Sequence, residues 1–233
     1  LSDQTRLIFL NSPCNPTGAS YSESEMQALG ATLGDYPDVV IVADDIYEHI
    51  HWDDQPFVSM AAACPALADR IVTTNGVSKA YAMTGWRIGY AAGPEALIRA
   101  MITVQSQSTT NPCSVSQAAA VAALTGDQTC IAEMVKAYRA RHDYVVPALN
   151  AIPGFECRPG EGTFYAFPRV QQAIEACGLE DDVEFTEFLL NEADVAVVPG
   201  TAFGAPGYIR LSFACAMEDL EESVQRINRA VPA

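Results

Sequence analysis

VVIVADD, residues 39–45, is a continuous apolar run that ends in two acidic side chains. Such a run predicts a strand covered on both faces, which is typical of a parallel sheet. Two further apolar runs flank it, RLIFLNSP (6–13) and IVTTNGVSK (71–79), and each ends in polar or loop-forming residues. Between the first two runs, Ser22 and Glu25 form the pattern of a helix-capping box. This order predicts an α/β fold with a mostly parallel sheet.

The chain changes character after the third run. WRIGYAAG (86–93) follows it too closely for a helical crossover, so we expect an antiparallel strand there. Residues 114–126 begin with Ser and end with Gly, which favours a helix. Asp127 is placed to cap a longer helix, and Pro147 should kink that helix or end it early.

The last third of the sequence predicts a smaller α+β unit. Its expected elements are a strand at 164–170, a helix at about 182–193, strands at 195–198 and 208–214, and a final helix at 218–230. We therefore expect three parts. Residues 1–113 form the C-terminal part of a large domain, residues 114–150 form connecting helices, and residues 151–233 form a small C-terminal domain.

Composition excludes several classes of protein. The chain has 233 residues, 49% of them hydrophobic, and a net charge of −16. The charge argues against nucleic acid and anionic membranes as partners, although local arginines can still bind a small anion. No apolar run approaches the length needed to span a bilayer.

The cysteine and histidine patterns offer no metal site or disulfide framework. Seven cysteines are scattered without C-x-x-C spacing, which indicates reduced thiols and a cytoplasmic protein. His49 and His51 could share one face of a strand, but a metal would need further ligands, so we expect none. The sequence has no initiating Met and no signal peptide, and we expect it to be the later part of a longer chain.

The two lysines of the chain, Lys79 and Lys136, stand against eleven arginines. A lysine amine can lose its proton and form a Schiff base, whereas arginine can do neither. Lys79 follows the third apolar run and has no acidic neighbour in sequence. Its own surroundings leave two interpretations open, a reactive amine or an ordinary surface lysine.

Polar groups follow each of the three predicted strands. Asn15 comes after the first, Asp44 closes the second, and Ser78 and Lys79 follow the third. Ligands of open α/β sheets bind beyond the carboxyl ends of the strands, so these groups could converge on one small molecule. Proteins that bind pyridoxal phosphate use a lysine amine to form a Schiff base with its aldehyde. They also use a carboxylate to bind its pyridine nitrogen.

Four segments carry a family resemblance: NSPCNPTG (11–18), VADDIYEHI (42–50), SKAYAMTGWRIGY (78–90) and YIRLSFA (208–214). In this order and spacing they resemble the fold-type-I, class I/II pyridoxal-phosphate-dependent aminotransferases, in particular the bacterial aspartate-aminotransferase-like group. The resemblance covers essentially the whole chain. It implies the PLP-dependent transferase fold and a cytoplasmic homodimer that moves an amino group between an L-amino acid and a 2-oxo acid.

The resemblance assigns roles around the cofactor ring by position. Lys79 would be the Schiff-base lysine and the proton shuttle, and Asp44 would pair with the pyridine nitrogen. Asn15 and Tyr47 would bond the phenolic oxygen, although Tyr47 could simply pack. Asp45, beside Asp44, is expected to be a solvated neighbour.

The resemblance also implies residues for the cofactor phosphate and the substrate. Arg87 would hold the phosphate with Ser78, and Arg210 would clamp the substrate's α-carboxylate with help from Asn15. A surface ion pair is the alternative for Arg210. Many relatives carry Ser or Thr three residues before the lysine, where this chain has Gly76, and we expect Ser78, Asn75 or backbone amides to compensate.

A second departure from the family is that its members have a long segment before the point where this chain begins. That segment normally supplies a phosphate-binding turn, an aromatic side chain that stacks on the ring, part of the sheet and much of the dimer contact. We therefore expect the fragment alone to be a poor catalyst with exposed apolar surface.

Two rival functions stay open at this point. One is a ligand-sensing domain of a regulator with an aminotransferase-like fold. The other is a pyridoxal-phosphate-dependent C–S lyase, which keeps the cofactor and changes the reaction.

Overall fold

The structure is a computed structural model that describes residues 1–52 and 55–232. The chain divides into two units, and it enters the second one twice. The first unit contains Leu1–Pro13 and Ser20–Glu133. The second contains Cys14–Ala19 and the chain from Met134 onward. The boundary between the units falls within the long helix α5 (Thr129–Asn150).

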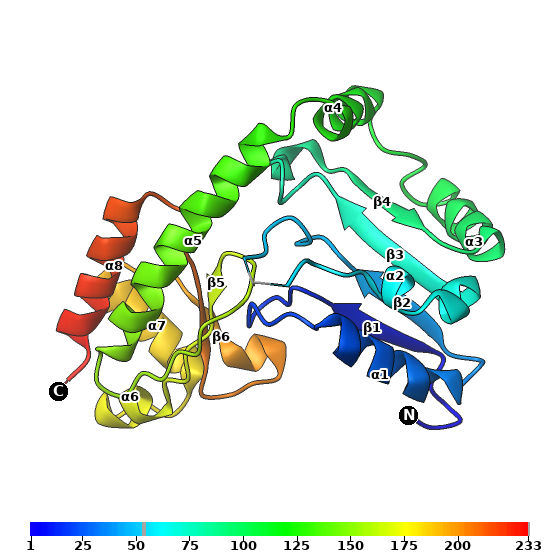
Figure 1. Ribbon diagram of the computed structural model, residues 1–233. Helices are drawn as coiled ribbons and strands as arrows, with labels where there is room; N and C mark the ends of the chain where they lie inside the picture. Colours follow the sequence, from blue (N-terminus) through cyan, green and yellow to red (C-terminus); the bar gives the residue numbers. More distant parts are fainter. Residues whose placement is uncertain (53–54, 233) are drawn as a thin grey trace. The chain divides into compact units, whose positions relative to one another are not determined.

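The first unit is built on a four-stranded sheet in the order β1-β2-β3-β4 (Figure 1). Strands β1 (Leu7–Asn11), β2 (Val40–Asp44) and β3 (Ile71–Gly76) run parallel, and β4 (Gly89–Ala92) pairs antiparallel with β3. The predicted parallel strands and the predicted antiparallel strand are confirmed. β4 needs no crossover because it returns from β3 through the turn that carries Lys79.

One face of this sheet is buried by helix α1 (Glu23–Gly34). The predicted capping box starts the helix: the Ser22 hydroxyl accepts from the Glu25 N–H at 3.3 Å, and the Glu25 carboxylate accepts from the Ser22 N–H at 2.8 Å. Met26 of α1 packs with Leu10 and Ile41 of the strands and with Met60 in the short helix α2 (Met60–Ala63). Burial of these side chains fixes α1 on the sheet.

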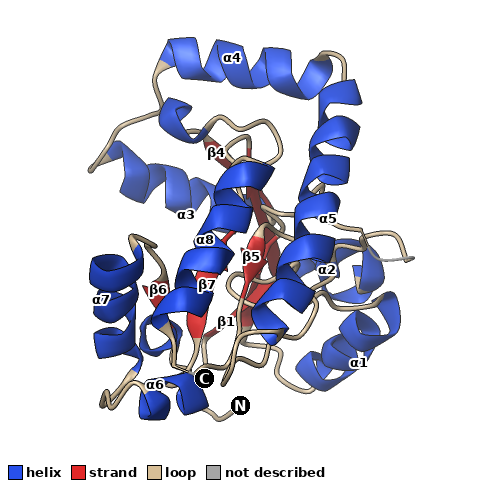
Figure 2. Ribbon diagram, turned by 90° about the vertical axis from the view of Figure 1, so that its left-hand side faces the viewer, coloured by secondary structure: helices blue, strands red, loops and turns tan. Residues whose placement is uncertain are grey.

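The opposite face of the sheet lies toward helix α3 (Glu95–Ser106), so that α1 and α3 are on either side of the strands (Figure 2). Side chains alternate along each strand, so Phe9 and Val42 point away from the α1 side. With Met101 and Val104 of α3 they line an apolar groove of about 800 Å³. Phe9 is 68% exposed and Val104 is 71% exposed. This face of the first unit is therefore an uncovered apolar surface.

The isolated 233-residue chain should self-associate through this surface, because burying it removes apolar area from water. We expect Val104→Lys to shift the chain toward monomer in sedimentation experiments at equal concentration. Leu190→Lys is the matched control, since Leu190 is also an exposed apolar helix residue but lies in the second unit. A chain that is already monomeric, or equal effects of both variants, would contradict this prediction.

Beyond the sheet, the first unit contains helix α4 (Ser114–Thr125) and the 3₁₀ turns η1 (Pro65–Arg70) and η2 (Thr84–Trp86). Arg70 closes η1 by donating to three backbone carbonyls, those of Leu33, Tyr36 and Val39. These bonds join the end of α1 to the start of β2 and so help to fix where β2 begins.

The second unit has a three-stranded antiparallel sheet in the order β5-β7-β6. Its strands are β5 (Tyr165–Ala166), β6 (Val198–Pro199) and β7 (Ile209–Ser212). Its other elements are α6 (Gln171–Ala176), α7 (Asp182–Ala193), η3 (Gly200–Phe203) and α8 (Met217–Ala230). The helices expected at 182–193 and 218–230 are confirmed, the second to within one residue.

The strands of the second unit are shorter than the sequence predicts. Pro168 has no N–H to donate, and the ladder after β5 is reduced to isolated bridges at Arg169. The strand expected at 195–198 begins at Val198 instead. Asp194 takes a left-handed conformation at the end of α7, and Val195 is still bonded to the helix through the Leu189 carbonyl.

Pro147 does not end α5 early, since the helix continues to Asn150, and the alternative of a kink at this position stays a prediction. A proline inside a helix costs about 3 kcal/mol. The turn around it buries Val145, Val146 and Leu149, and each such side chain contributes about 1.5–3 kcal/mol when fully buried. Tertiary burial therefore outweighs the local penalty.

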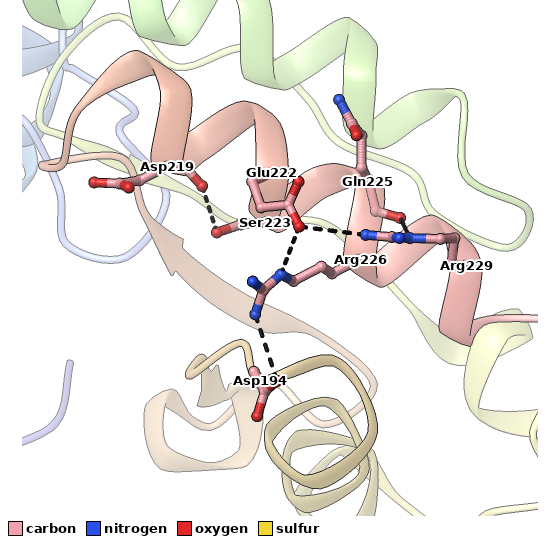
Figure 3. Close-up of polar contacts among 7 residues, drawn as sticks. All are labelled: Asp194, Asp219, Glu222, Ser223, Gln225, Arg226 and Arg229. Atoms are coloured by element: carbon pink, nitrogen blue, oxygen red, sulfur yellow. Dashed lines mark hydrogen bonds and ion pairs between the residues drawn. The ribbon is translucent and has the colours of Figure 1, made fainter.

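Helix α8 joins α7 through an apolar stripe and a surface ion-pair group. Leu220, Val224 and Ile227 are buried on one face of α8. On the other, Arg226 contacts Glu222 at 2.9 Å and Asp194, at the end of α7, at 3.5 Å, as Figure 3 shows. Exposed ion pairs contribute little, so the apolar stripe is the main contact between these helices.

None of the helices in the described part of the chain is long and apolar enough to cross a membrane.

Candidate active site

The carboxyl edge of the parallel sheet brings three polar side chains side by side. Asn11, Asp44 and Thr74 stand opposite one another in the register of β1, β2 and β3. The Asp44 carboxylate accepts from the Ile46 N–H at 3.3 Å and from the Thr74 hydroxyl at 3.4 Å. The Asn11 amide donates to the Asp44 carbonyl at 2.9 Å. Asp44 is thus held by neutral donors, with no ion pair to a cation of the described residues.

Lys79 and Tyr47 come together in the first unit although 32 positions separate them in the sequence. Tyr47 is buried in the turn that follows β2, and Lys79 is half-buried in the turn that follows β3. The Lys79 Nζ lies 5.7 Å from the centroid of the Tyr47 ring. An aromatic face attracts a cation, so this contact holds the Lys79 side chain beside a buried ring. The role of Lys79 as a reactive amine stays a prediction.

Arg87 is exposed and ends the 3₁₀ turn η2 in a left-handed conformation, with φ of 52°. Its guanidinium donates to the Thr84 carbonyl at 2.7 Å. The described contacts of Arg87 therefore stay within its own turn, and they do not join it to Ser78 or Asp44. Ser78 is half-buried beside Lys79.

Gly76 occupies the place where many relatives carry Ser or Thr, and the backbone leaves no room for a side chain. A Cβ there would lie 2.9 Å from the Ile88 carbonyl oxygen, because β4 passes close to β3. Asn75, one expected substitute, donates to Glu48 at 2.6 Å and accepts from the Gly76 N–H at 2.7 Å. Its amide is therefore already bonded within the protein.

Asp45 is not the solvated neighbour that the sequence suggested, because it is only 4% exposed. Burial is the main cause that raises the pKa of Asp45 to about 7, and the charges of Glu48 and Asp44 add to it. The sequence shows two adjacent acids and cannot tell which one the turn buries.

Asp45 should make stability depend on pH. The unfolded chain releases this proton near pH 4 and the folded chain near pH 7, so stability falls as pH rises between those values and levels off above them. Asp45→Asn should remove this loss, which is about 4 kcal/mol at most. We expect the urea midpoint of the variant to exceed that of the wild type by much more at pH 8 than at pH 4.5.

The control for this experiment is Asp38→Asn, which replaces an exposed acid of the same unit and should change either midpoint little. A wild-type midpoint that does not fall from pH 4.5 to pH 8 relative to Asp45→Asn would show that the pKa of Asp45 is not raised in the folded protein.

The second unit brings Arg210 and Asn15 together. The Arg210 Nη1 donates to the Asn15 side-chain oxygen at 2.7 Å. The guanidinium carbon lies 4.4 Å from the centroid of the Tyr165 ring and 4.9 Å from that of Phe203. Asn15 comes from the loop after β1 and Arg210 from β7, and that loop belongs to the second unit.

The Arg210 Nε is buried and has no hydrogen-bond partner among the described residues. A buried donor without a partner costs free energy, and the cost is higher for a charged group. Arg210 also forms no ion pair there, so it does not fit the alternative of a surface ion pair. A guanidinium with a vacant donor between two aromatic rings is suited to a planar anion such as a carboxylate.

Several residues of these two clusters were not identified from the sequence. Thr74 lies in an ordinary apolar strand, and Tyr165 and Phe203 are aromatic residues without a motif of their own. A register prediction for β2 and β3 would have placed Thr74 beside Asp44. Nothing local indicates that Tyr165 and Phe203 contact Arg210, because that contact depends on tertiary structure.

A model of the family described as aminotransferase class I and II matches residues 1–227. The chain belongs to this family. An aspartate/prephenate aminotransferase of Nitrosomonas europaea is 52% identical over 233 residues, which cover 97% of this chain and 59% of that protein. An aspartate aminotransferase of Rhizobium meliloti is 48% identical over 235 residues, which cover 99% of this chain and 57% of that protein.

Solved aminotransferase structures share the fold. The aspartate aminotransferase from Rhizobium meliloti superposes with a TM-score of 0.93 at 46% identity, covering 99% of this chain and 59% of that one. The aromatic aminotransferase from Pyrococcus horikoshii gives 0.90 at 38% identity, covering 98% and 60%. The predicted α/β fold of the PLP-dependent transferases is confirmed. The chain spans about 59% of the length of the relatives it matches.

Class I and II aminotransferases of this kind use pyridoxal phosphate, and the first unit fits that cofactor. Lys79 is half-buried and carries an amine of the kind that condenses with an aldehyde. The Asp44 carboxylate makes no ion pair within the described chain and suits a protonated pyridine nitrogen. Among the described residues, no group of three or more His, Cys, Asp or Glu could hold a metal ion.

Proposed function

We propose that the protein containing this chain is a pyridoxal-phosphate-dependent aminotransferase that moves an amino group between an L-amino acid and a 2-oxo acid. The observation that carries the proposal is the half-buried Arg210, whose guanidinium is bonded to Asn15 and whose buried Nε has no hydrogen-bond partner among the described residues. Amino acids and 2-oxo acids share the α-carboxylate that such a group would bind. Two of the relatives are named for aspartate, which supports an acidic L-amino acid as amino donor.

The cofactor, when bound, supplies an aldehyde that condenses with amines and a ring that withdraws electrons from the substrate's α-carbon. Lys79 would hold the cofactor in a Schiff base, and its Nζ, once the substrate's amine has displaced it, would remove and return the proton at the α-carbon. Asp44 would keep the pyridine nitrogen protonated. Tyr47 and Asn15 would donate to the phenolic oxygen, and Arg87 with Ser78 would bind the phosphate.

Arg210 and Asn15 would hold the substrate's α-carboxylate. A guanidinium forms two parallel hydrogen bonds to a carboxylate, and this geometry fixes the orientation of the bound amino acid. The aromatic rings of Tyr165 and Phe203 contact the guanidinium and restrict where it can move. The pairing also strengthens as water is excluded, because the local dielectric constant falls.

The homodimeric state and the cytoplasmic location belong to this proposal as well. All seven cysteines are free thiols in the structure, which suits a reducing compartment. The relatives described above are named as aminotransferases, which supports this activity over a ligand-sensing regulator or a C–S lyase. Amine transfer that depends on a 2-oxo acid, without pyruvate release, would distinguish the aminotransferase from the lyase.

The full-length protein incubated with pyridoxal phosphate should be labelled at Lys79 when it is reduced with borohydride. The reason is that a Schiff base requires a lysine amine, and Lys79 lies beside the Tyr47 ring in the turn after β3. Peptide mapping by mass spectrometry identifies the site. Lys136 is exposed and serves as the internal control. A label on Lys136, or on neither lysine, would refute the assignment.

Asp44→Asn should reduce the turnover of amino acid far more than Asp45→Asn. Removing a preorganised charged group from an active site typically costs at least about a hundredfold in rate, and only Asp44 is assigned to the ring nitrogen. Asp45→Asn keeps the shape of a buried side chain and should cost less than about tenfold. Steady-state kinetics of both full-length variants decide this, and equal losses would mean that the assignment of Asp44 is wrong.

A further inference from the structure

Asp182 is a buried carboxylate that none of the proposed catalytic roles uses. It is the first residue of α7 and is 0% exposed. Its oxygens accept three hydrogen bonds, from the Thr201 N–H at 2.7 Å, the Thr201 hydroxyl at 2.8 Å and the Gly207 N–H at 3.2 Å. A buried charge is costly unless it is well bonded, so this arrangement calls for an explanation.

The bonds of Asp182 fasten both ends of one loop. Thr201 lies at the start of the loop, in η3, and Gly207 lies just before β7. The loop is closed on itself, since the Gly200 N–H donates to the Tyr208 carbonyl at 2.7 Å and the Ala205 N–H to the Gly200 carbonyl at 3.0 Å. Loop 200–207 is therefore closed by its own backbone bonds and fastened to α7 at both ends by the Asp182 carboxylate.

The middle of loop 200–207 carries Phe203, and Phe203 forms one of the two aromatic walls of Arg210. Its ring centroid lies 4.9 Å from the Arg210 guanidinium carbon. It also meets the Phe167 ring edge-on at 6.0 Å, and Phe167 stacks on Tyr208 at 5.1 Å. Any shift of the loop would move this wall relative to the guanidinium.

We propose that Asp182 is a positioning residue for substrate binding, because it fixes loop 200–207 and thereby holds Phe203 against the carboxylate-binding Arg210. This rests on the proposed function of Arg210. It assigns a functional consequence to a side chain that touches neither the substrate nor Arg210. All the contacts involved lie within the second unit.

The charge of Asp182 matters as much as its shape. Burial by itself raises the pKa of Asp182, but the bonds from Thr201 and Gly207 outweigh it, so that the pKa lies below its ordinary value. The carboxylate therefore stays ionised as an acceptor for all three donors. In Asp182→Asn, the side-chain NH₂ group would face one of the Thr201 or Gly207 donors and leave that donor without an acceptor.

Binding of succinate tests the proposal, because succinate has two carboxylates and no amine to react. Its dissociation constant is measured by calorimetry on the full-length protein loaded with pyridoxal phosphate. We expect Asp182→Asn to raise this constant roughly fivefold, as mutations that act through a chain of packed contacts do. We also expect the KM for the amino acid to rise while kcat changes less than about twofold.

Asp181→Asn is the matched control. Asp181 precedes Asp182, is exposed, and caps α7 by accepting from the Val183 and Glu184 N–H groups at 2.9 Å each. Asn is an equally good cap, so succinate binding should stay unchanged. If Asp182→Asn does not fold, Thr201→Val removes only the hydroxyl bond and should weaken binding in the same direction by a smaller factor.

A double-mutant cycle tests the route through the loop. In a Phe203→Leu background the aromatic wall is absent, so Asp182→Asn should have little further effect on succinate binding. An undiminished effect in that background would overturn the proposal. So would wild-type affinity in both Asp182→Asn and Thr201→Val.

Arg210→Lys separates this inference from the proposed function. It should weaken succinate binding if Arg210 binds a substrate carboxylate. No loss in Arg210→Lys means that the proposed function of Arg210 fails. A loss in Arg210→Lys without one in Asp182→Asn means that only the role of Asp182 fails.

Discussion

The hydrogen bond from Arg210 to Asn15 joins residues 195 positions apart, and the second unit is organised around it. It holds Cys14–Ala19, a loop between two elements of the first unit, within the second unit. The loop is secured further at Gly18, whose carbonyl accepts from the Glu161 and Gly162 N–H groups at 2.9 and 3.0 Å. A Cβ at Gly18 would lie 2.8 Å from the Gly162 oxygen, so this approach requires glycine. The constraint behind these contacts is a charged guanidinium that is partly removed from water.

The acidity of the chain and the cationic groups of its candidate site are compatible because electrostatic effects are local. The net charge of −16 creates a field that repels anions at long range, and salt screens that field beyond about 10 Å. Within the second unit, Arg210 faces aromatic rings and an amide in place of acids. An anion that reaches it meets an unopposed positive charge. The acidic surface then keeps the protein soluble, and the local charge of Arg210 determines whether an anion binds at the site.

Different interactions position the polar side chains of the two units. In the first, parallel strands align Asn11, Asp44 and Thr74 at one edge, and α1 covers only one face of the sheet. The apolar groove beside α3 shows that this layer is not closed by the described chain. In the second, short strands contribute few backbone pairs, and buried polar groups such as Asp182 fix the loops. Because a buried charge tolerates few arrangements, the second unit can hold a precise geometry with little regular secondary structure.

The sequence by itself determined the main elements of the first unit and the family, and it supplied the prediction of the reactive groups. Apolar runs and the Ser22–Glu25 box act through neighbouring residues, so periodicity and capping were enough to place β1 to β3 and α1. The spacing of four segments was enough to indicate the aminotransferase family. These features are local along the chain, and local preferences can be identified without knowing the fold.

Only the tertiary structure decided which polar groups are buried and what surrounds them. The sequence predicted Asp45 as a solvated neighbour of Asp44, whereas the turn after β2 buries Asp45 because of the way it closes against β3. It allowed Pro147 either to kink α5 or to end it, and the helix continues past Pro147 to Asn150, where Leu149 is buried. It gave no indication that Tyr165, Phe203 and Asp182 act around Arg210. Burial and desolvation depend on segments that are far apart in the chain, and local preferences contain no information about which of them meet.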